Sequence, residues 1–477
     1  MSVARAADIA TFGLVELADA IAAGEVSSVD ATAACLARIE AWQPSRNAFI
    51  RIDAEAALDA ARQCDLRQAR GERLGPLHGV PLAHKDMFYR QGRVSTGGSL
   101  IRRHWAATET ATALSRLDAA GAVELGTLNM AEFAGGPTGH NMHYGHCGNA
   151  HHAEYISGGS SSGSGSAVAA CLAFGALGSD TGASVRLPAA ANGVVGIKPT
   201  YGRISRRGAM PRSWSLDHVG VLARSARDCA RLLAVVAGHD PGDPTSSARP
   251  VPDYEAGLGR PLRGVRIGLP DPDRLGPIDE QVAQALAASA ETYAGLGARL
   301  VPVPFDDMTV LFRAAETIIK SEAAAIHGPW LASRREDYAP LLRSRIEVGL
   351  LIPATQYIDA LRLRAKLTER FLETTMRGVD ALHLPVIPFP LPRLADCDVE
   401  SGGGGRDVLA LVGRMTALTR PMNFLGLPAI SVPCGFCRDG LPIGAQLAAR
   451  PFDEPLLLAL AHQFGQAAPQ HRRIPRL

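Results

Sequence analysis

Short apolar segments alternate with longer amphipathic ones along almost the whole 477-residue chain, and this alternation restricts the fold more than any other feature. Apolar positions at helical spacing predict helices within residues 10–43 (two helices), 54–68, 110–120, 226–237, 278–296 and 310–376. Short apolar runs predict strands within residues 76–85, 122–125, 265–269, 380–390 and 429–433. Strands that alternate with helices in this way predict an α/β architecture with one large sheet. We find no clear linker and no repeat, so we expect one domain.

Charge and hydropathy exclude several classes of protein. Lys and Arg number 49 against 47 Asp and Glu, so the net charge is only +2, and no basic stripe indicates a nucleic-acid partner. The longest apolar stretches, such as residues 167–177, are too short to span a membrane. The N-terminal segment carries Asp8, Glu16 and Asp19 within its apolar pattern, which is typical of an amphipathic helix and not of a signal peptide. We therefore expect a cytoplasmic protein whose eight cysteines are reduced.

Two motifs could indicate a metal site. Cys434 and Cys437 have CxxC spacing, but no second pair completes a zinc site. Residues 139–152 contain five of the 14 histidines, but without a His-Glu-x-x-His arrangement. We therefore expect neither a metal nor any other cofactor, and the role of the histidine cluster stays open.

A Gly/Ser-rich segment at residues 158–166 leads directly into small residues at 167–173 that predict a helix. A glycine-rich loop before a helix offers backbone N–H groups to an anion. The GxxxxGK[ST] pattern of a phosphate-binding loop is absent, and GxGxxG is not matched cleanly. A flexible Ser/Gly loop is the alternative interpretation, as it is for the glycine run at residues 401–405.

The Gly/Ser-rich segment and two others together resemble the amidase signature family of serine hydrolases. The other two are the DTGxSxR-type run at 179–188 and the segment GPLHGVPLAHKD that contains Lys85. Residues 193–203 and 423–431 extend the likeness over most of the chain. The resemblance implies a single large mixed β-sheet with α-helices on both sides and one domain over residues 1–477. Its signature core would lie at about 75–230 and its variable helical substrate region at about 305–380.

The resemblance also assigns a catalytic triad. It makes Ser184 the nucleophile, Ser160 a proton relay after a cis Gly159–Ser160 peptide, and Lys85 the general base. A serine hydroxyl attacks an amide poorly unless its proton is removed. A lysine performs that task only if burial and its neighbours hold it neutral near pH 7. The relayed proton then goes to the departing amine, which is a poor leaving group without it.

Around this triad the resemblance implies an oxyanion hole and supporting residues. Backbone N–H groups would form the hole, at Thr181, Gly182, Ala183 and Ser184. Asp180 and Arg186 would brace the loop, and Ser161 would support the proton relay. Taken alone, Asp180 and Arg186 would pass as an ordinary ion pair, and Ser161 as a loop residue. The family usually has glycine where this chain has Ala183, so an added methyl group would narrow the acyl site.

The substrate contacts are predicted from the more variable segments. Asn141 and Tyr144 would border the pocket, and apolar side chains would hold an acyl group, although most of them could equally be core. The residues that we expect at the substrate are Met130, Gly135, Gly136, Asn141, Tyr144, Trp214, Ile318 and Phe389. Residues 205–215 are either a substrate lid or an arginine-rich surface turn.

Thr416 stands where glutamine-dependent amidotransferase relatives usually keep an aspartate, and this predicts a neutral pocket that suits an uncharged amide or carbamate. The leading hypothesis is therefore a cofactor-free amidase that acts through an acyl-enzyme on a small-molecule amide, anilide, carbamate or ester. The alternatives are a component of an amidotransferase-type complex and a non-catalytic binding protein. We expect no nucleic-acid or membrane partner, and a homodimer is possible.

Overall fold

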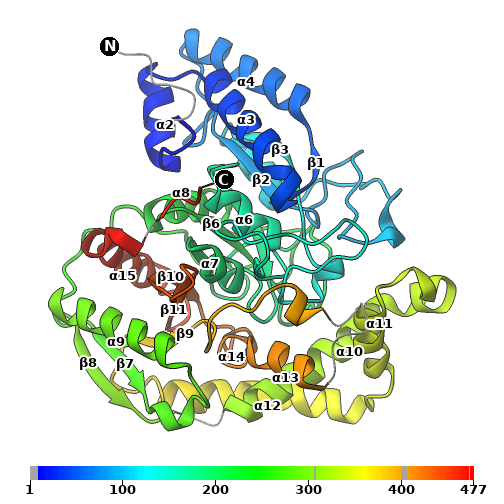
Figure 1. Cartoon of the computed structure of the whole chain (residues 1–477), viewed down its shortest axis with the longest axis vertical. Coiled ribbons are helices and arrows are strands. Elements are labelled where there is room, and N and C mark those ends of the chain that lie inside the picture. Colours follow the sequence, from blue (N-terminus) through cyan, green and yellow to red (C-terminus); the bar gives the residue numbers. More distant parts are fainter. Residues whose placement is uncertain (1–8, 306–307, 399–405, 472, 477) are drawn as a thin grey trace.

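The computed structural model describes residues 9–305, 308–398, 406–471 and 473–476. In this part of the chain, eleven strands form one sheet in the order β1-β3-β2-β4-β6-β5-β10-β11-β9-β7-β8 (Figure 1). The strands are β1 (Phe49–Ile52), β2 (Pro81–Lys85), β3 (Val123–Leu128), β4 (Gly175–Asp180), β5 (Val195–Lys198), β6 (His218–Ala223), β7 (Arg266–Pro270), β8 (Arg299–Val303), β9 (Ala381–Pro385), β10 (Ala429–Phe436) and β11 (Pro442–Ala449).

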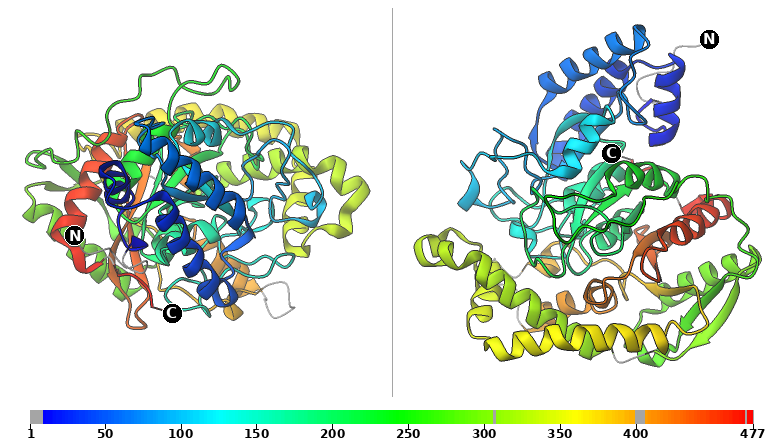
Figure 2. Two further views of the ribbon diagram at one scale, coloured as in Figure 1. Left: turned by 90° about the horizontal axis from the view of Figure 1, so that it is seen from above. Right: turned by 180° about the vertical axis from the view of Figure 1, so that it is seen from behind.

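Fourteen α-helices accompany the sheet in the described residues. They are α2 (Leu14–Ala23), α3 (Ser28–Arg46), α4 (Ala54–Ala69), α5 (Thr112–Ala119), α6 (Ser162–Ala169), α7 (Arg186–Asn192), α8 (Ala226–Val236), α9 (Glu280–Gly295), α10 (Met308–Arg334), α11 (Pro340–Leu350), α12 (Ala354–Glu373), α13 (Arg406–Arg414), α14 (Arg420–Phe424) and α15 (Glu454–Ala467). Figure 2 shows α10, α11 and α12 as a long helical layer at one end of the molecule.

The sheet is mixed, as the family resemblance implies. β2 runs parallel to both β3 and β4, and β7 runs parallel to both β8 and β9. The central strands β4, β6, β5, β10, β11 and β9 pair antiparallel to one another. All residues of these central strands except Phe436 are buried, which explains their continuous apolar and small-residue runs.

Helices cover both faces of the sheet. Side chains alternate between the two faces of a strand, so Gly175 and Gly178 on β4 face opposite ways. A Cβ atom at Gly175 would meet Leu232 of α8 and Leu14 of α2, whereas one at Gly178 would meet Ser161, the residue before α6. The prediction of a mixed sheet between two helical layers is therefore confirmed, and the single-domain organisation stays a prediction.

Most predicted elements agree with the structure to within a few residues, but the helix after the Gly/Ser-rich segment does not. We expected it at residues 167–173, whereas α6 begins at Ser162 and ends at Ala169. The helix packs so closely that a Cβ atom at Gly163 would lie 2.2 Å from the carbonyl oxygen of Ala48. Glycine is thus required inside this helix by a backbone contact, which local helix propensity does not reveal. The predicted loop at 401–405 lies outside the described residues.

No described helix is both long enough and apolar enough to span a membrane.

Candidate active site

The three segments of the family resemblance meet at one edge of the sheet. β2 ends at Lys85 and β4 ends at Asp180, and these two strands are parallel neighbours, so their carboxyl ends lie together. The loop that carries Ser160 comes directly before α6, whose first turn lies against β4 through the contact between Ser161 and Gly178. In open α/β sheets, sites typically form where the carboxyl ends of strands meet loops in this way.

Lys85 is fully buried beneath this edge. Its Nζ donates to Ser160 Oγ at 2.7 Å and to Ser179 Oγ at 2.8 Å. Burial lowers the pKa of Lys85 from 10.5 to about 7; Asp217 and Asp180 oppose this shift, and Arg212 adds to it. The lysine is therefore close to half-neutral at neutral pH, as a general base must be.

The peptide bond between Gly159 and Ser160 is cis, as the resemblance implies. Ser161 holds this loop against β4, because its Oγ donates to the Ser179 carbonyl oxygen at 3.2 Å and accepts from the Ser179 N–H at 3.3 Å. Ser179 thus links Lys85 to the loop. Ser179 opens the segment that resembles DTGxSxR, but no sequence pattern indicates its contact with Lys85.

Residues 181–184 form a turn between β4 and α7, and their backbone N–H groups donate to no other group in the described structure. The next two amides, of Val185 and Arg186, donate to Asp180 Oδ2 at 3.1 and 3.4 Å. Thr181 Oγ1 donates to Asp217 Oδ1 at 2.6 Å and fixes the start of the turn. Donors held in a rigid turn without a protein acceptor are suited to an oxyanion.

Asp180 and Arg186 form a fully buried ion pair, with Arg186 Nη2 2.9 Å from Asp180 Oδ1. Arg186 also donates to Asn423 Oδ1 at 2.7 Å and to the Thr419 carbonyl at 2.9 Å. The neighbouring guanidinium of Arg186 offsets the cost of burial and holds the pKa of Asp180 below its usual range. This network joins the turn to α14, and the supporting role of Asp180 and Arg186 at the site stays a prediction.

A cavity of about 380 Å³ opens onto this turn. Its wall combines Thr181, Gly182, Ala183 and Ser184 with α10, α11 and the segment before α14. The lining residues are Ala134, Gly135, Gly136, Pro137, Thr181, Gly182, Ala183, Ser184, Arg212, Phe312, Glu316, Ile319, Lys320, Ala323, Arg345, Ile346, Leu409, Val412, Gly413, Thr416 and Arg420. A volume of this order fits a small molecule, and Ser184 is the predicted triad residue that it reaches.

The expectation of a neutral pocket is wrong. Thr416 does line the cavity, but so do Arg212, Arg345 and Arg420. These arginines come from three distant segments of the chain, and only the fold brings them together. No local sequence pattern signals this cluster.

Of the eight expected substrate contacts, the structure brings two, Gly135 and Gly136, to the cavity. Met130 and Ile318 are fully buried in the core, and the neighbour of Ile318, Ile319, faces the cavity instead. The helical pattern identified α10 as apolar but did not fix which of two adjacent isoleucines faces the cavity.

The other four expected contacts lie elsewhere. Asn141 is a structural residue, because its Nδ2 donates to the carbonyls of Gly98 and Met130 and its Oδ1 accepts from two backbone amides. Tyr144 lies on the loop that Asn141 fixes, and neither residue lines the cavity. Phe389 packs against the core beneath Arg414. Trp214 is 43% exposed and lies outside the cavity.

Residues 205–215, the predicted lid or surface turn, are held against α10. Glu322, a buried residue of α10, accepts from Ser215 N at 3.1 Å and from Tyr357 Oη at 2.9 Å, and also from the hydroxyls of Ser213 and Ser215. Arg212 precedes these serines, so Glu322 fixes the segment that brings a cation to the cavity.

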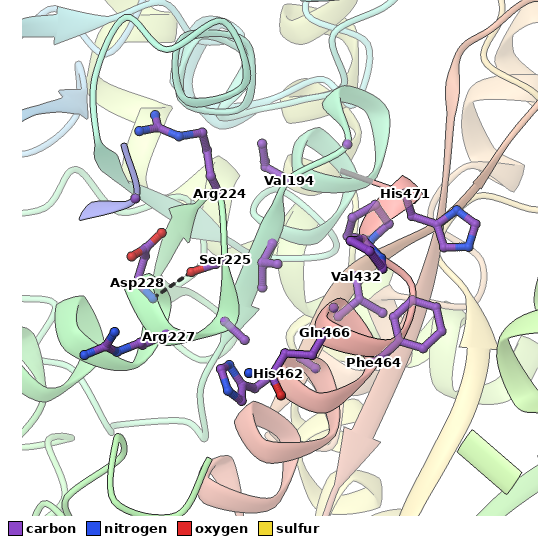
Figure 3. Close-up of a pocket in the computed structure, with 18 of the residues that line it drawn as sticks. Val194, Arg224, Ser225, Arg227, Asp228, Val432, His462, Phe464, Gln466 and His471 are labelled. Carbon is purple, nitrogen blue, oxygen red and sulfur yellow. Dashed lines mark hydrogen bonds between the residues drawn. The ribbon is translucent and has the colours of Figure 1, made fainter. Parts of the chain in front are cut away.

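A second cavity, of about 450 Å³, lies between α2, α8 and α15 (Figure 3). Its polar groups serve the packing of the helices: Ser225 caps α8 by accepting from the Asp228 N–H, and Asp228 Oδ1 accepts from the Val15 N–H at 3.0 Å. It contains none of the residues expected at the site.

Within the described residues, no group of three or more His, Cys, Asp or Glu side chains is arranged to hold a metal ion. In the histidine segment, His143 Nε2 lies 3.0 Å from Glu132 Oε1, and burial lowers the pKa of both His140 and His151 to about 4. Cys434 and Cys437 are free and buried, like the other six cysteines.

The fold and this site define a class of protein, and the family comparison agrees. The family model described as Amidase matches residues 30–458, so the chain belongs to the amidase signature family. Among curated proteins, a glutamyl-tRNA(Gln) amidotransferase subunit of Azotobacter vinelandii is 40% identical over 97% of this chain and 98% of its own.

Solved structures include hydrolases of the same family. One chain, from a vestigial protein complex that bears on the origins of an s-triazine catabolic enzyme, has a TM-score of 0.88 and 37% identity, and the match covers 98% of this chain and 100% of that one. The peptide amidase of Stenotrophomonas maltophilia has a TM-score of 0.85 and 30% identity, with 98% and 99% covered. Both the fold and the family therefore indicate an enzyme that acts on carbon–nitrogen bonds of amides.

Proposed function

We propose that this protein cleaves a small-molecule amide through an acyl-enzyme formed on Ser184, with Ser160 as the proton relay and Lys85 as the general base. The observation that carries this proposal is the 2.7 Å hydrogen bond from Lys85 Nζ to Ser160 Oγ, below a cavity that Ser184 lines. A buried lysine with a pKa near 7 and an unoccupied set of backbone donors at 181–184 support it.

The proposed reaction proceeds in two stages. Neutral Lys85 takes a proton from Ser160, which takes one from Ser184 as Ser184 Oγ attacks the amide carbonyl carbon. The N–H groups of residues 181–184 stabilise the negative charge on the carbonyl oxygen. Ser160 then returns the proton to the leaving nitrogen, and the C–N bond breaks. Lys85 gives its proton back to Ser160, which restores both groups. In the second stage, water attacks the acyl carbon and gives a proton through Ser160 to Lys85. This proton returns to Ser184 Oγ as its bond to the acyl carbon breaks and the free acid leaves.

Release of ammonia or amine by the purified chain tests this proposal. Ser184→Ala should lower turnover by at least a thousandfold, and Lys85→Ala should do so most strongly near neutral pH. Ser164→Ala is a matched control, because Ser164 Oγ donates to the Leu177 carbonyl and Ser164 does not line the cavity. Equal rates in the wild type and in both site variants would refute the mechanism.

The second candidate function is that of one component of an amidotransferase-type complex, and the names of the curated relatives support it better than they support an independent amidase. The relatives at about 40% identity are subunits by name, and a solved structure at 37% identity comes from a protein complex. In this case the chain would release ammonia from glutamine, and mainly in the presence of its partners.

Activity of the isolated chain separates the two candidates. The independent enzyme is supported if the pure protein turns over amides and the addition of a cell extract does not raise the rate. Turnover of glutamine that appears only when extract is added supports the complex. A chelator present in both assays tests the expectation that no metal takes part. The cytoplasmic location and the possible homodimer stay predictions.

A further inference from the structure

A third cavity, of about 300 Å³, has Ser179 in its wall, and we call it the Ser179 pocket. Among the described residues, none lines both this pocket and the cavity at Ser184. The lining of the Ser179 pocket includes the buried residues Ser179, Asp217, His218 and Val219 and the exposed residues Arg207 and Trp214. Because its wall runs from exposed to buried residues, this pocket brings solvent into the protein by a second opening.

Ser179 joins this pocket to the buried lysine. Its Oγ accepts from Lys85 Nζ at 2.8 Å, and within the described residues its own hydroxyl proton goes to no protein acceptor. A neutral lysine has one lone pair, and in the proposed reaction that lone pair accepts from Ser160. Ser179 must then accept from one of the N–H groups of Lys85, and its hydroxyl proton can be donated to water in the pocket.

His218 supplies an acceptor at the same pocket. Its Nδ1 lies 2.7 Å from the Leu216 carbonyl oxygen, which can only accept, so Nδ1 carries the proton and Nε2 carries the lone pair. Asn423 Nδ2 is 3.4 Å from Nδ1 but directs its two hydrogens to Asp180. His218 Nε2 is buried and has no hydrogen-bond partner in the described part of the chain. A buried acceptor beside a polar cavity is typically satisfied by water.

The general base needs an outlet for its proton. With a pKa of about 7, roughly half of the Lys85 side chains are charged at neutral pH, and a charged lysine cannot accept from Ser160. Lys85 and Ser160 are fully buried, and Ser160 leads from the lysine toward Ser184 and the reacting carbonyl. A substrate in the cavity closes that side. A proton that is still on Lys85 when the substrate binds must therefore leave by another route.

We propose that Lys85 exchanges its proton with solvent through Ser179 and the water of the Ser179 pocket, apart from the cavity that holds the substrate. To discharge the lysine, one Nζ–H bond of charged Lys85 breaks and its proton passes to Ser179 Oγ. The original hydroxyl proton of Ser179 passes at the same time to a water molecule in the pocket. Lys85 is then neutral, Ser179 is unchanged, and the hydronium ion gives its proton to bulk water. This inference rests on the proposed function, because it serves the same general base.

Hydrogen exchange at Lys85 Nζ tests this route without turnover. The chain has four lysines, so ¹⁵N-labelled lysine gives few NMR signals, and Lys85→Met identifies the signal of Lys85. Ser184→Cys, alkylated with N-phenylmaleimide, closes the cavity, and the eight native cysteines are all buried. The exchange rate of the Nζ hydrogens with water is measured before and after alkylation at pH 6, where Lys85 is mostly charged.

Alkylation should change this rate less than threefold while Ser179 is present. Ser179→Ala should slow exchange in the alkylated protein at least tenfold, whereas Ser179→Thr, which keeps a hydroxyl, should not. Ala209→Leu adds an apolar group to the wall of the pocket and should also slow exchange, and Ala56→Leu, at an exposed position of α4, is its matched control. The proposal is overturned if alkylation alone slows exchange tenfold, or if Ser179→Ala leaves the rate of the alkylated protein unchanged.

Amide hydrolysis by the wild type keeps failure of this inference apart from failure of the proposed function. If no amide is hydrolysed but exchange in the alkylated protein depends on Ser179, the proposed function fails and the proton route stands. If amides are hydrolysed but alkylation alone slows exchange tenfold, the proposed function stands and the proton route fails.

Discussion

Replacing Lys85 by methionine should abolish activity and yet make the folded chain more stable at neutral pH. Lys85 is fully buried, and folding lowers its pKa from 10.5 to about 7. Above both pKa values the lysine is neutral in either state, and folding costs it no proton. As the pH falls below 10.5, the unfolded chain binds a proton that the folded chain does not, so the folded state loses stability until the pH reaches about 7.

Proton linkage gives the size of this effect. With these two pKa values, the penalty on the folded state is about 4 kcal/mol at pH 7 and about 1 kcal/mol at pH 9.5. Methionine has a similar length and no proton to lose, but the variant gives up the hydrogen bonds to Ser160 and Ser179, worth about 1 kcal/mol each. Lys85→Met should therefore be about 2 kcal/mol more stable than the wild type at pH 7 and about equal to it at pH 9.5.

Urea denaturation at the two pH values measures this difference without any substrate. The change between the two pH values, about 3 kcal/mol, does not depend on the value assigned to the hydrogen bonds. Lys366→Met replaces an exposed lysine of α12 and should show no such change. A Lys85→Met variant whose stability relative to the wild type is the same at both pH values would show that folding leaves the lysine charged, and the assignment of a general base would fall.

Lys85, Glu322 and Asp180 each lead to one further prediction. The kcat/KM of the wild type should rise about tenfold between pH 6 and pH 8 as Lys85 loses its proton, and a pH–rate profile that is flat over this range would contradict the base. Glu322→Ala removes the acceptor for Ser213, Ser215 and Tyr357. It should lower the free energy of unfolding by about 3 kcal/mol, as urea denaturation measures, and steady-state kinetics should show that it raises KM more than it lowers kcat. Asp180→Asn leaves the buried charge of Arg186 without its partner and should lower the free energy of unfolding by about 3–5 kcal/mol. The control is Arg227→Gln, which removes an exposed arginine that pairs with Asp19 at 3.7 Å and should leave the unfolding temperature nearly unchanged.

The sequence predicts the architecture well because hydrophobic periodicity is a local property. α8 and α9 and strands such as β7 and β9 lie close to their expected residues. Ser27 caps α3, because its hydroxyl accepts from the Asp30 N–H at 2.9 Å. The predicted start of α6 was wrong because glycine inside a helix is locally unfavourable, and only the close approach of Ala48 explains why it is tolerated there.

The candidate site, like the fold, could be predicted from the sequence only in part. Lys85, Ser160 and Ser184 stand in recognisable motifs, so the sequence alone could nominate them, and the structure places Lys85 and Ser160 in direct contact. The walls of the cavity could not be predicted. Arg212, Arg345 and Arg420 belong to three segments with no shared pattern, and tertiary packing decides which side of α10 faces the ligand. The sequence shows Thr416 as a departure from the amidotransferase relatives, but it does not show that Arg420 lies beside Thr416 in the cavity wall. The prediction of a neutral pocket was therefore wrong.

The arginines of the cavity and the buried lysine act on one another. Arg212 lowers the pKa of Lys85, and Asp217, which holds both the Arg212 amide and the Thr181 hydroxyl, raises it. Arg212 therefore helps burial to keep the lysine neutral and able to accept a proton. A negatively charged group bound beside Arg212 would cancel part of that effect and raise the pKa of Lys85. A neutral ligand would leave the field of Arg212, and the pKa of Lys85, unchanged.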